Sequence, residues 1–375
     1  MKSQYNILLF LMSQFLWSVE GNCQTPLVTV CPLPNEIDES SGIEIGKDNT
    51  YWTHNDSGDK PYLYQIDQKG RLIKKVLISN ALGVDIEDIA VEEDKFMYAA
   101  DIGNNKNDRK NLVIYKIKLS DLYTNDAVDA EEIKLRYPDQ NLFPPESTER
   151  NFDCEAIFHY NHHLYLFTKS RGESLYTKCY ELPDVKGDYT AKLIDSFQTG
   201  NWVTGADISP SKNKVALICG SVVFVFSEFK GTNFFKGKIM KTVLNATQKE
   251  GIVFETDKKL VISDEKNKDR NGNIYILNID NEKLFTPNID RFSIDPSPCD
   301  KKLFIAYNEI ETKNYKIDIR NIDDNQFMLN ETIEVKPKFT KKFNLMMYND
   351  GNYSITFHEV DGKYLLKLLF SVKHQ

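Results

Sequence analysis

The sequence lacks long apolar runs, basic clusters and closely spaced cysteine pairs. Apart from an interrupted stretch near the N-terminus, no segment approaches the ~20 apolar residues of a membrane helix, so no transmembrane segment is expected. The formal net charge is −8, and Lys and Arg are interleaved with Asp and Glu along the chain. Because no basic stripe is present, nucleic acid is not an expected partner. No C-x-x-C pair occurs, which disfavours a cysteine-based zinc site.

The motifs of the familiar enzyme classes are also missing. The chain has no Gly-x-Ser-x-Gly elbow, no His-Glu-x-x-His, no glycine-rich phosphate loop and no dinucleotide fingerprint. Each of these motifs supplies the nucleophile, the metal ligands or the close backbone approach on which its chemistry depends. Serine hydrolases, zinc proteases and nucleotide-dependent enzymes are therefore disfavoured.

The N-terminus has the composition of an export signal. A positive charge precedes an apolar run over residues 7–17, and small residues suited to a cleavage site follow it. We predict that residues 1–21 are a secretory signal peptide and that the mature protein is secreted or held at the cell surface. A lipid anchor at Cys23 is the weaker alternative, because the residues before it are a poor approach to a lipidated cysteine.

Six cysteines in an exported chain permit disulfides, but their spacing selects no pairing. Buried free thiols are the alternative, and both remain open from the sequence. The cysteines are Cys23, Cys31, Cys154, Cys179, Cys219 and Cys299.

A short phrase ending in isoleucine occurs five times. Its occurrences are Ser41-Gly42-Ile43, Glu87-Asp88-Ile89, Glu155-Ala156-Ile157, Ala206-Asp207-Ile208 and Glu250-Gly251-Ile252. The isoleucines of successive phrases are 46, 68, 51 and 44 residues apart. A propeller blade of four short strands takes roughly 40 to 50 residues, so this period predicts an all-β fold of the β-propeller type.

Comparable apolar segments follow each phrase, and several alternate with the period of a half-buried strand. We predict five blades over residues 22–290. A spare strand at residues 27–33 would complete the last blade and close the ring, which removes an exposed sheet edge. The longest interval contains a Pro- and charge-rich connection, residues 139–151, so a degenerate sixth blade is the alternative.

A different pattern of strands and turns begins at about residue 291 and predicts a small β-sandwich over residues 291–375. The Pro296-Ser297-Pro298 opening, the IRNIDDN segment (319–325), a late Asp-Gly-Asn-Tyr turn and a basic tail resemble the C-terminal sorting domain of the type IX secretion system of Bacteroidetes. The opening departs from that family's usual Pro-Asn-Pro. The resemblance implies recognition by the type IX secretion machinery. A sixth blade is the alternative, because residues 294–305 echo residues 208–218.

The repeat region itself carries a second resemblance. Its segments are ESSGIEI, WTHNDSGD, DIEDIA, ADIGNN, Arg109, DCEAIF, LYLFTKS, VTGADISPS, FFKGK and QKEGIVF. They are similar to an uncharacterised family of exported Bacteroidetes propellers, related in pattern to the phytase-like and strictosidine-synthase-like group. That family brings no established reaction, and its distant relatives imply calcium binding and hydrolysis of phosphoesters or lactones. A shared fold does not by itself carry such an activity over.

Two sets of polar residues are expected to surround one mouth of the propeller channel. The turn entering the innermost strand of a blade and the turn between its second and third strands lie at the same end. The entering turns supply the candidate metal ligands Glu39, Asp85, Glu87, Asp153, Glu155 and Glu250. The second set supplies the candidate binding residues Asn55, Asp56, Asp101, Asn104, Lys169, Arg171, Asp264 and Glu265.

Several carboxylates at one narrow opening repel one another strongly unless a positive charge neutralises them. Calcium is the cation we expect, because it takes six to eight oxygen ligands and tolerates irregular geometry. The preferred ligands are Asp85, Glu87, Asp153 and Glu155. The alternative is that these acids accept backbone hydrogen bonds from adjacent blades or pair with Lys169, Arg171 and Lys266.

Asn, Asp and Gly are concentrated in residues 55–59 and 101–105, as in small calcium loops. Neither segment has EF-hand spacing, and Asx-turns account for both. His54 falls at the same end, either as a general base or as a packed side chain. The histidines expected to face solvent at the opposite end are His159, His162 and His163.

Two functions are compatible with these features. The first is an extracellular binding module that holds a glycan, a peptide or a surface partner on the polar face or on residues 139–151. The second is a calcium-dependent hydrolase of phosphoester, ester or lactone substrates, in which Glu87 or Glu155 activates water. Binding is favoured, because no nucleophile or base is identifiable beyond the acidic ring.

Overall fold

The computed structural model describes residues 27–56, 58–172, 176–244, 247–266, 272–279, 292–295, 302–307, 312–321, 326–336, 340–360 and 364–372. The expected signal peptide, Cys23, Cys299 and the Pro296-Ser297-Pro298 opening lie outside these residues. Within the described ranges, no helix is long and apolar enough to cross a lipid bilayer.

Most of the described residues are in strands, which form seven sheets. Helical structure there is limited to short segments. These are α1 (Leu119–Thr124) and the 3-10 turns η1 (Lys47–Asn49), η2 (Ser147–Glu149) and η3 (Phe234–Lys236).

Five sheets follow one another along the chain, each beginning with an innermost strand that contains the recurring phrase. The first contains β2 (Ser40–Ile45), β3 (Tyr51–Asn55), β4 (Tyr62–Ile66) and β5 (Leu72–Ile78). The second contains β6 (Ile86–Glu92), β7 (Phe96–Asp101), β8 (Leu112–Lys118) and β10 (Glu131–Arg136). The third contains β11 (Asp153–Tyr160), β12 (His163–Lys169), β13 (Tyr176–Pro183) and β15 (Lys192–Gln198). The fourth contains β16 (Gly205–Ile208), β17 (Lys214–Cys219), β18 (Val222–Ser227) and β19 (Lys238–Val243).

The fifth sheet joins distant parts of the chain. It contains β20 (Lys249–Thr256), β21 (Lys259–Asp264) and β22 (Asn273–Asn278), and its outer strand is β1 (Val28–Pro32), antiparallel to β22. Two short strands also extend other sheets in parallel: β9 (Ala127–Val128) lies beside β5, and β14 (Gly187–Thr190) lies beside β10. Since β14 belongs to the connection between β13 and β15, it ties the third repeat to the second sheet.

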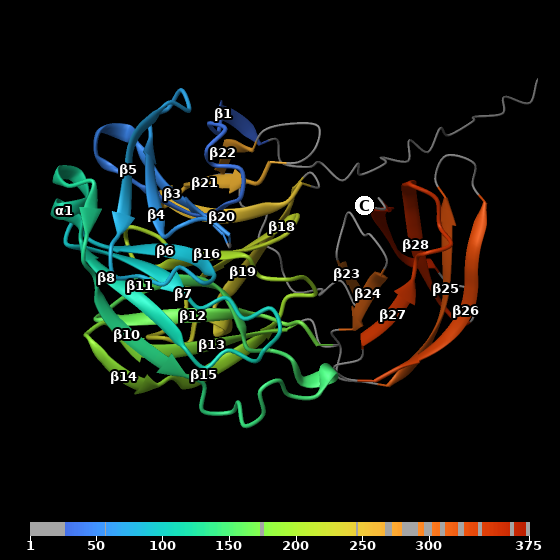
Figure 1. The fold of residues 1–375 in the computed structure, drawn as a ribbon. Coiled ribbons are helices and arrows are strands. Elements are labelled where there is room, and N and C mark those ends of the chain that lie inside the picture. The colour runs from blue at the N-terminus through green and yellow to red at the C-terminus, as the bar shows by residue number, and fades with distance from the viewer. Residues whose placement is uncertain are drawn as a thin grey trace, which may run out of the picture.

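The innermost strands lie next to one another at the centre of these sheets. Each contacts two others: β2 contacts β6 and β20, and β11 contacts β6 and β16, while β16 also contacts β20. Separate clusters of buried apolar side chains fill the spaces between successive sheets, including the space between the fifth and the first. In Figure 1 these sheets, coloured blue to yellow, lie together as one group. The arrangement is of the β-propeller type.

Strands buried on both faces explain the continuous apolar runs in the sequence. In β17, Val215 and Leu217 pack into the cluster between the third and fourth sheets. The alternate residues Ala216 and Ile218 pack into the cluster between the fourth and fifth sheets. Because successive side chains of a strand point to opposite faces, an unbroken apolar run serves two neighbouring interfaces.

The described cysteines are buried free thiols and form no disulfide among themselves. They are Cys31, Cys154, Cys179 and Cys219. Cys154 and Cys179 lie in the same sheet but pack into different apolar clusters. For these four residues, the free-thiol alternative is therefore the correct one.

The C-terminal segment forms two further sheets. One contains β23 (Phe292–Asp295), β24 (Lys302–Tyr307) and β27 (Thr340–Asn344). The other contains β25 (Lys313–Asn321), β26 (Phe327–Val335), β28 (Gly351–Glu359) and β29 (Tyr364–Val372). Both contribute to one apolar cluster, which includes Leu303, Ile317, Phe343 and Ile355. Figure 1 shows these strands, in orange and red, as a group of their own.

A candidate cation site at the acidic end

The recurring phrase forms a β-bulge in four of the five innermost strands. In β6 and β11 the extra residues are Glu87 and Glu155. A bulge inserts one residue that has no partner on the neighbouring strand, and it re-aims the side chains around it. The two glutamates therefore leave the ordinary alternation at the end where β6 and β11 begin. We call this the acidic end.

An aspartate directly before the isoleucine of the phrase, in β6 and β16, points to the neighbouring sheet instead. Asp88 accepts hydrogen bonds from the backbone N–H groups of Ile89 at 2.9 Å and of Ile157, in the third sheet, at 2.8 Å. Asp207 likewise accepts the N–H of Phe254, in the fifth sheet, at 2.7 Å. Asp88 and Asp207 therefore join adjacent sheets.

The first carboxylate group at the acidic end consists of Asp56, Asp85 and Glu87, which bring one oxygen each within 4.8 Å of one another. Asp85 and Glu87 are only 8% and 3% exposed. Gly103 lies against both, since a Cβ there would clash with Glu87 Oε1 and Asp85 Oδ2. The buried Oδ1 atom of Asp85 has no hydrogen-bond partner among the described residues.

The second group consists of Glu87, Asp153 and Glu155, whose carboxylate oxygens also lie within 4.8 Å of one another. Arg171 donates from Nε to Asp153 at 2.5 Å and from Nη2 to Glu155 at 3.0 Å. Lys169 Nζ lies 2.8 Å from the other oxygen of Glu155. Burial and the charge of Glu155 raise the pKa of Asp153 to about 6, although Arg171 and Lys169 oppose the rise.

The two groups differ in how their charge is balanced. Among the described residues, ion pairs are found for Asp153 and Glu155 but not for Asp85 or Glu87. Burial raises the pKa of Asp85 to about 7, and the nearby charges of Asp56 and Asp153 add to the rise. Burial also raises the pKa of Glu87 well above its ordinary value, and the charge of Glu155 adds to it. Asp85 and Glu87 therefore have less positive charge paired with them than Asp153 and Glu155 have.

Three further acids share this electrostatic environment. Burial raises the pKa of Glu265 to about 9, and the charges of Glu250 and Asp56 add to the rise. Burial raises the pKa of Glu250 while Lys169 opposes the change, and burial together with Asp56 raises the pKa of Glu39. The charge of Asp56 thus raises the pKa values of acids that belong to several sheets. Asp56 is close enough to all of them to affect their ionisation.

Asp101 and Asn104, two candidate binding residues, position the carboxylates. Asp101 accepts the N–H groups of Val84 and Asp85 at 3.0 Å each and is paired with Arg109 at 2.7 Å. These bonds fix Asp85 and the segment that leads into β6. Asn104 donates its backbone N–H to Asp153 at 2.6 Å.

Asn55, Asp264 and His54 are also held by hydrogen bonds. The side chain of Asn55 donates to Asp59 at 3.1 Å, and Asp264 accepts two hydrogen bonds from β22. His54 is fully buried, accepts the N–H of Gly42 at 3.0 Å, and has a pKa lowered to about 4 by burial. Its neutral, enclosed ring fits the packed alternative better than a general base.

The expectation that all three histidines of the opposite end face solvent is wrong for His159, which is only 9% exposed. Its ring stacks on Tyr98 of the second sheet, with ring centroids 5.4 Å apart, and this contact removes it from water. The side chains of His162 and His163 remain 80% and 38% exposed.

Sequence reasoning missed Trp202. Its half-buried ring lies 5.2 Å from the guanidinium carbon of Arg171 and 5.7 Å from Lys169 Nζ, within the range of cation–π interactions. The sequence did contain a signal for Trp202, namely its position just before β16. Asp85 and Asp153 have equivalent positions at the starts of β6 and β11, and these were the positions used to select the acids. The acidic end therefore combines oxygen donors for a hard cation with two basic groups and an aromatic ring.

Comparisons with known proteins give no family assignment. No family model matches the sequence, and no curated protein matches it.

Several solved structures are similar to this chain at low identity. One is PorZ of Porphyromonas gingivalis, a surface component of the type IX secretion system, with 10% identity and a TM-score of 0.33 over 91% of this chain and 47% of PorZ. The chain thus spans about half the length of PorZ. A candidate 6-phosphogluconolactonase of Bacteroides uniformis shares 14% identity, with a TM-score of 0.36 over 83% of this chain and 89% of that chain. A candidate gluconolactonase shares 10% identity, with a TM-score of 0.39 over 64% of this chain and 74% of that chain.

Proposed function

We propose that residues 22–290 form a five-bladed β-propeller closed by β1, exported by a signal peptide at residues 1–21. The pairing of β1 with β22, the contacts between innermost strands and the apolar clusters between successive sheets support this architecture. Residues 291–375 are proposed to be a β-sandwich sorting domain read by the type IX secretion machinery. Their separate apolar cluster and their sequence motifs support that role.

The acidic end is proposed to bind Ca²⁺ through Asp56, Asp85 and Glu87. One observation carries this proposal: Asp85 and Glu87 are buried without an ion pair among the described residues, beside acids that Arg171 and Lys169 neutralise. Burying an unpaired carboxylate is costly, so this half of the site favours a cation or protons. Calcium suits it, because the donors are all oxygens and come from segments that are irregular or bulged.

The bound cation is proposed to serve recognition of an acidic glycan outside the cell. Three carboxylates that offer one oxygen each leave at least three of the six to eight coordination positions of calcium open, and oxygens of water or of a ligand take these positions. The cation supplies the positive charge that favours an anionic ligand, while Arg171 and Lys169, which are paired with Glu155, keep the neighbouring acids from repelling that ligand. The half-buried ring of Trp202 offers an apolar face against which a sugar ring can pack.

Calorimetric titration of chelator-stripped protein with Ca²⁺ tests the cation site. We expect binding that is weakened at least about tenfold by Asp85→Asn, which removes a ligand charge, and by Gly103→Ala, whose methyl group invades the site. The matched control is Asp188→Asn, because Asp188 forms an exposed pair with Arg136. Unchanged affinity in both site variants would contradict the assignment.

Binding to glycans of defined charge, measured with calcium and with chelator, tests the ligand class. Acidic glycans are expected to bind only with calcium, and Trp202→Ala is expected to weaken them without changing the affinity for Ca²⁺. Equal binding of neutral and acidic glycans would argue against recognition through the cation and Arg171.

A hydrolase is the second candidate, and the pKa of Asp85 favours it. In this alternative Asp56 and Glu87 hold the cation, and Asp85, whose pKa burial raises to about 7, stands beside it as the general base. Calcium-dependent turnover of phosphoester, ester or lactone substrates that Asp85→Asn abolishes would select this function. Glycan binding without turnover would select the binding module.

A further inference from the structure

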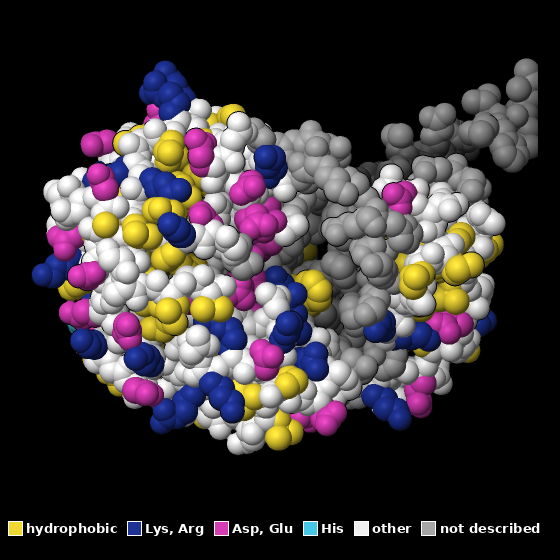
Figure 2. Space-filling model, viewed as in Figure 1, with side chains coloured by type: hydrophobic (Ala, Val, Ile, Leu, Met, Phe, Trp, Pro, Cys, Tyr) yellow, Lys and Arg dark blue, Asp and Glu magenta, His cyan; other side chains and the backbone are white. Residues whose placement is uncertain are grey.

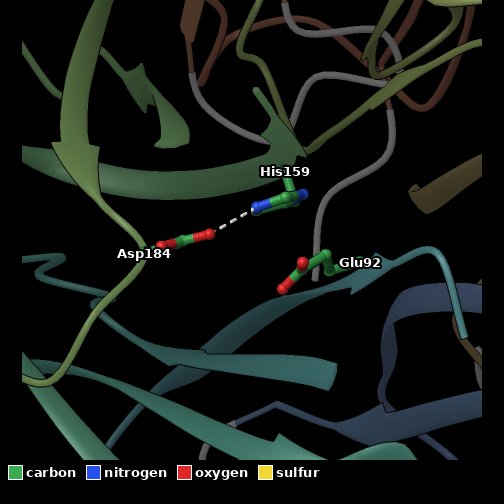
Figure 3. Close-up of side chains that lie close together, drawn as sticks. All are labelled: Glu92, His159 and Asp184. Carbon is green, nitrogen blue, oxygen red and sulfur yellow. Dashed lines mark hydrogen bonds and ion pairs between the residues drawn. The ribbon is translucent and has the colours of Figure 1, made fainter. Parts of the chain in front are cut away.

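A second cluster of ligand-type side chains lies at the opposite end of the same strands. It consists of Glu92, His159 and Asp184, whose donor atoms lie within 4.8 Å of one another. Figure 3 shows Asp184 and Glu92 approaching the ring of His159 from two sides. Each of the three residues is less than a tenth exposed.

The cluster joins two sheets. Glu92 ends β6 of the second sheet, whereas His159 lies near the end of β11 and Asp184 directly follows β13 of the third. At about 3.3 Å per strand residue, His159 is roughly 20 Å along β11 from Asp153 at the acidic end. The two ends are therefore chemically independent.

The His159 ring is already held in a fixed orientation. Its Nε2 atom lies 2.9 Å from Asp184 Oδ2, and its face stacks on Tyr98 at an interplanar angle of 6°. The Tyr98 hydroxyl in turn donates to Glu92 at 3.0 Å. The His159 ring is thus oriented by stacking and by Asp184, and the Glu92 carboxylate is oriented by the Tyr98 hydroxyl. Metal ligands need this kind of pre-orientation.

A fourth donor, which is a second imidazole nitrogen, is close by. His162 Nδ1 lies 3.9 Å from the same Asp184 oxygen, and the side chain is 80% exposed, so it is free to turn. Asn161 and His162 both adopt positive φ, of 50° and 61°, in the two-residue turn between β11 and β12. The turn and a 3.3 Å hydrogen bond from the Asp184 N–H to the His162 carbonyl fix the backbone of His162 beside Asp184. Only the side chain of His162 has to turn to present its nitrogen.

We propose that Glu92, His159, Asp184 and His162 form a structural Zn²⁺ site that links the second and third sheets. Two imidazole nitrogens and two carboxylate oxygens are a donor set that tetrahedral zinc accepts. Zinc replaces the shared proton between His159 and Asp184, and the exposed Lys95 leaves Glu92, with which it pairs at 3.3 Å. The Tyr98 hydroxyl remains as the hydrogen-bond donor that orients Glu92.

Titration with Co²⁺ followed by visible absorption, and with Zn²⁺ against a chromophoric chelator, tests the site. We expect one equivalent per chain and the intense absorption of four-coordinate Co²⁺. His159→Gln should lower the affinity by more than the 10- to 100-fold that loss of an outer-shell partner costs. Zn²⁺ should also raise the Tm of the wild-type protein, because it binds only when the two sheets are together.

Three variants test whether these particular side chains hold the metal. His162→Ala changes an exposed side chain, so it keeps the fold and should weaken Zn²⁺ at least about tenfold. His163→Ala, at the adjacent exposed histidine, and Asp188→Asn, in an exposed ion pair with Arg136, should leave Zn²⁺ affinity unchanged. Absence of binding by the wild-type protein, or wild-type affinity in both His159→Gln and His162→Ala, would overturn the proposal.

Discussion

At the scale of single residues, the acidic end depends on which carboxylates have a positive partner. Arg171 bridges Asp153 and Glu155, so those two acids are neutralised within the protein. No comparable ion pair among the described residues reaches Asp85 or Glu87. Since a buried charge without a partner is unfavourable, the metal-free protein responds by binding protons.

The first prediction concerns the pH dependence of stability. The pKa of Asp85 is raised from 3.8 to about 7 in the folded protein, so protonation stabilises the fold below about pH 4 and this contribution is lost as the pH rises through 7. In the presence of a chelator, we expect the Tm to fall between pH 5 and pH 8. Saturating Ca²⁺ should oppose this fall, because it neutralises the ionised group.

The control for this prediction is Asp85→Asn, which removes the titrating group. Its Tm in chelator should vary less with pH than that of the wild-type protein over the same interval. A wild-type Tm that rises with pH in chelator would contradict the origin assigned to the effect.

Sequence alone could place the acids at one end, but it could not show which of them face one another there and which bind the backbone of a neighbouring sheet. Glu87 and Asp88 are adjacent and chemically alike, yet Glu87 belongs to the carboxylate group of the acidic end and Asp88 accepts a backbone hydrogen bond from the next sheet. The bulge in β6 separates them, and a bulge depends on pairing with β7, which local sequence does not specify. The partners Lys169 and Arg171 were predicted at the correct end, because strand order alone determines it.

At the scale of elements, buried aspartates hold adjacent innermost strands together. Asp88 on β6 satisfies the N–H of Ile157 on β11, and Asp207 on β16 satisfies that of Phe254 on β20. In addition, Gly42 makes room for Asp88, because a Cβ there would lie 2.6 Å from Asp88 Oδ1. The phrase therefore provides both an acceptor and the space for it.

The second prediction concerns Asp88→Ala. The change leaves two buried N–H groups, of Ile89 and Ile157, without an acceptor, at a cost on the order of 1–3 kcal/mol each. We expect chemical denaturation to show this loss in the free energy of unfolding. Exposed Asp188→Ala should change it by less than about 0.5 kcal/mol. A stability loss no greater than that of the control would show that Asp88 does not join the sheets.

Strands were predictable where the chain serves two apolar interfaces, and less so elsewhere. The segments that follow each phrase form strands as expected, since their apolar runs need burial on both faces. In contrast, α1, β9 and β14 were not predicted. The two short strands depend on contacts with a sheet distant in sequence, and such contacts leave little local pattern.

At the scale of the whole molecule, charged side chains of both signs lie scattered among uncharged ones over the visible surface (Figure 2). The distribution agrees with the interleaved charges of the sequence. The concentrated charge lies instead in the buried acids of the acidic end. The recognition that we propose there depends on the few side chains at the ends of the innermost strands.

The third prediction concerns β1, which links the start of the described chain to its fifth sheet. The segment buries Cys31 and Leu33 and pairs with β22, so its removal exposes apolar side chains and an unpaired strand edge. Leu33 alone contributes roughly 1.5–3 kcal/mol, and backbone pairing raises the total to the order of 5 kcal/mol.

We expect a chain starting at residue 34 to have a lower Tm and to self-associate in size-exclusion chromatography, compared with a chain starting at residue 22. Val28→Ser, at a position 55% exposed on the same strand, should preserve both properties. If the chain starting at residue 34 were monomeric with an unchanged Tm, β1 would not close the propeller.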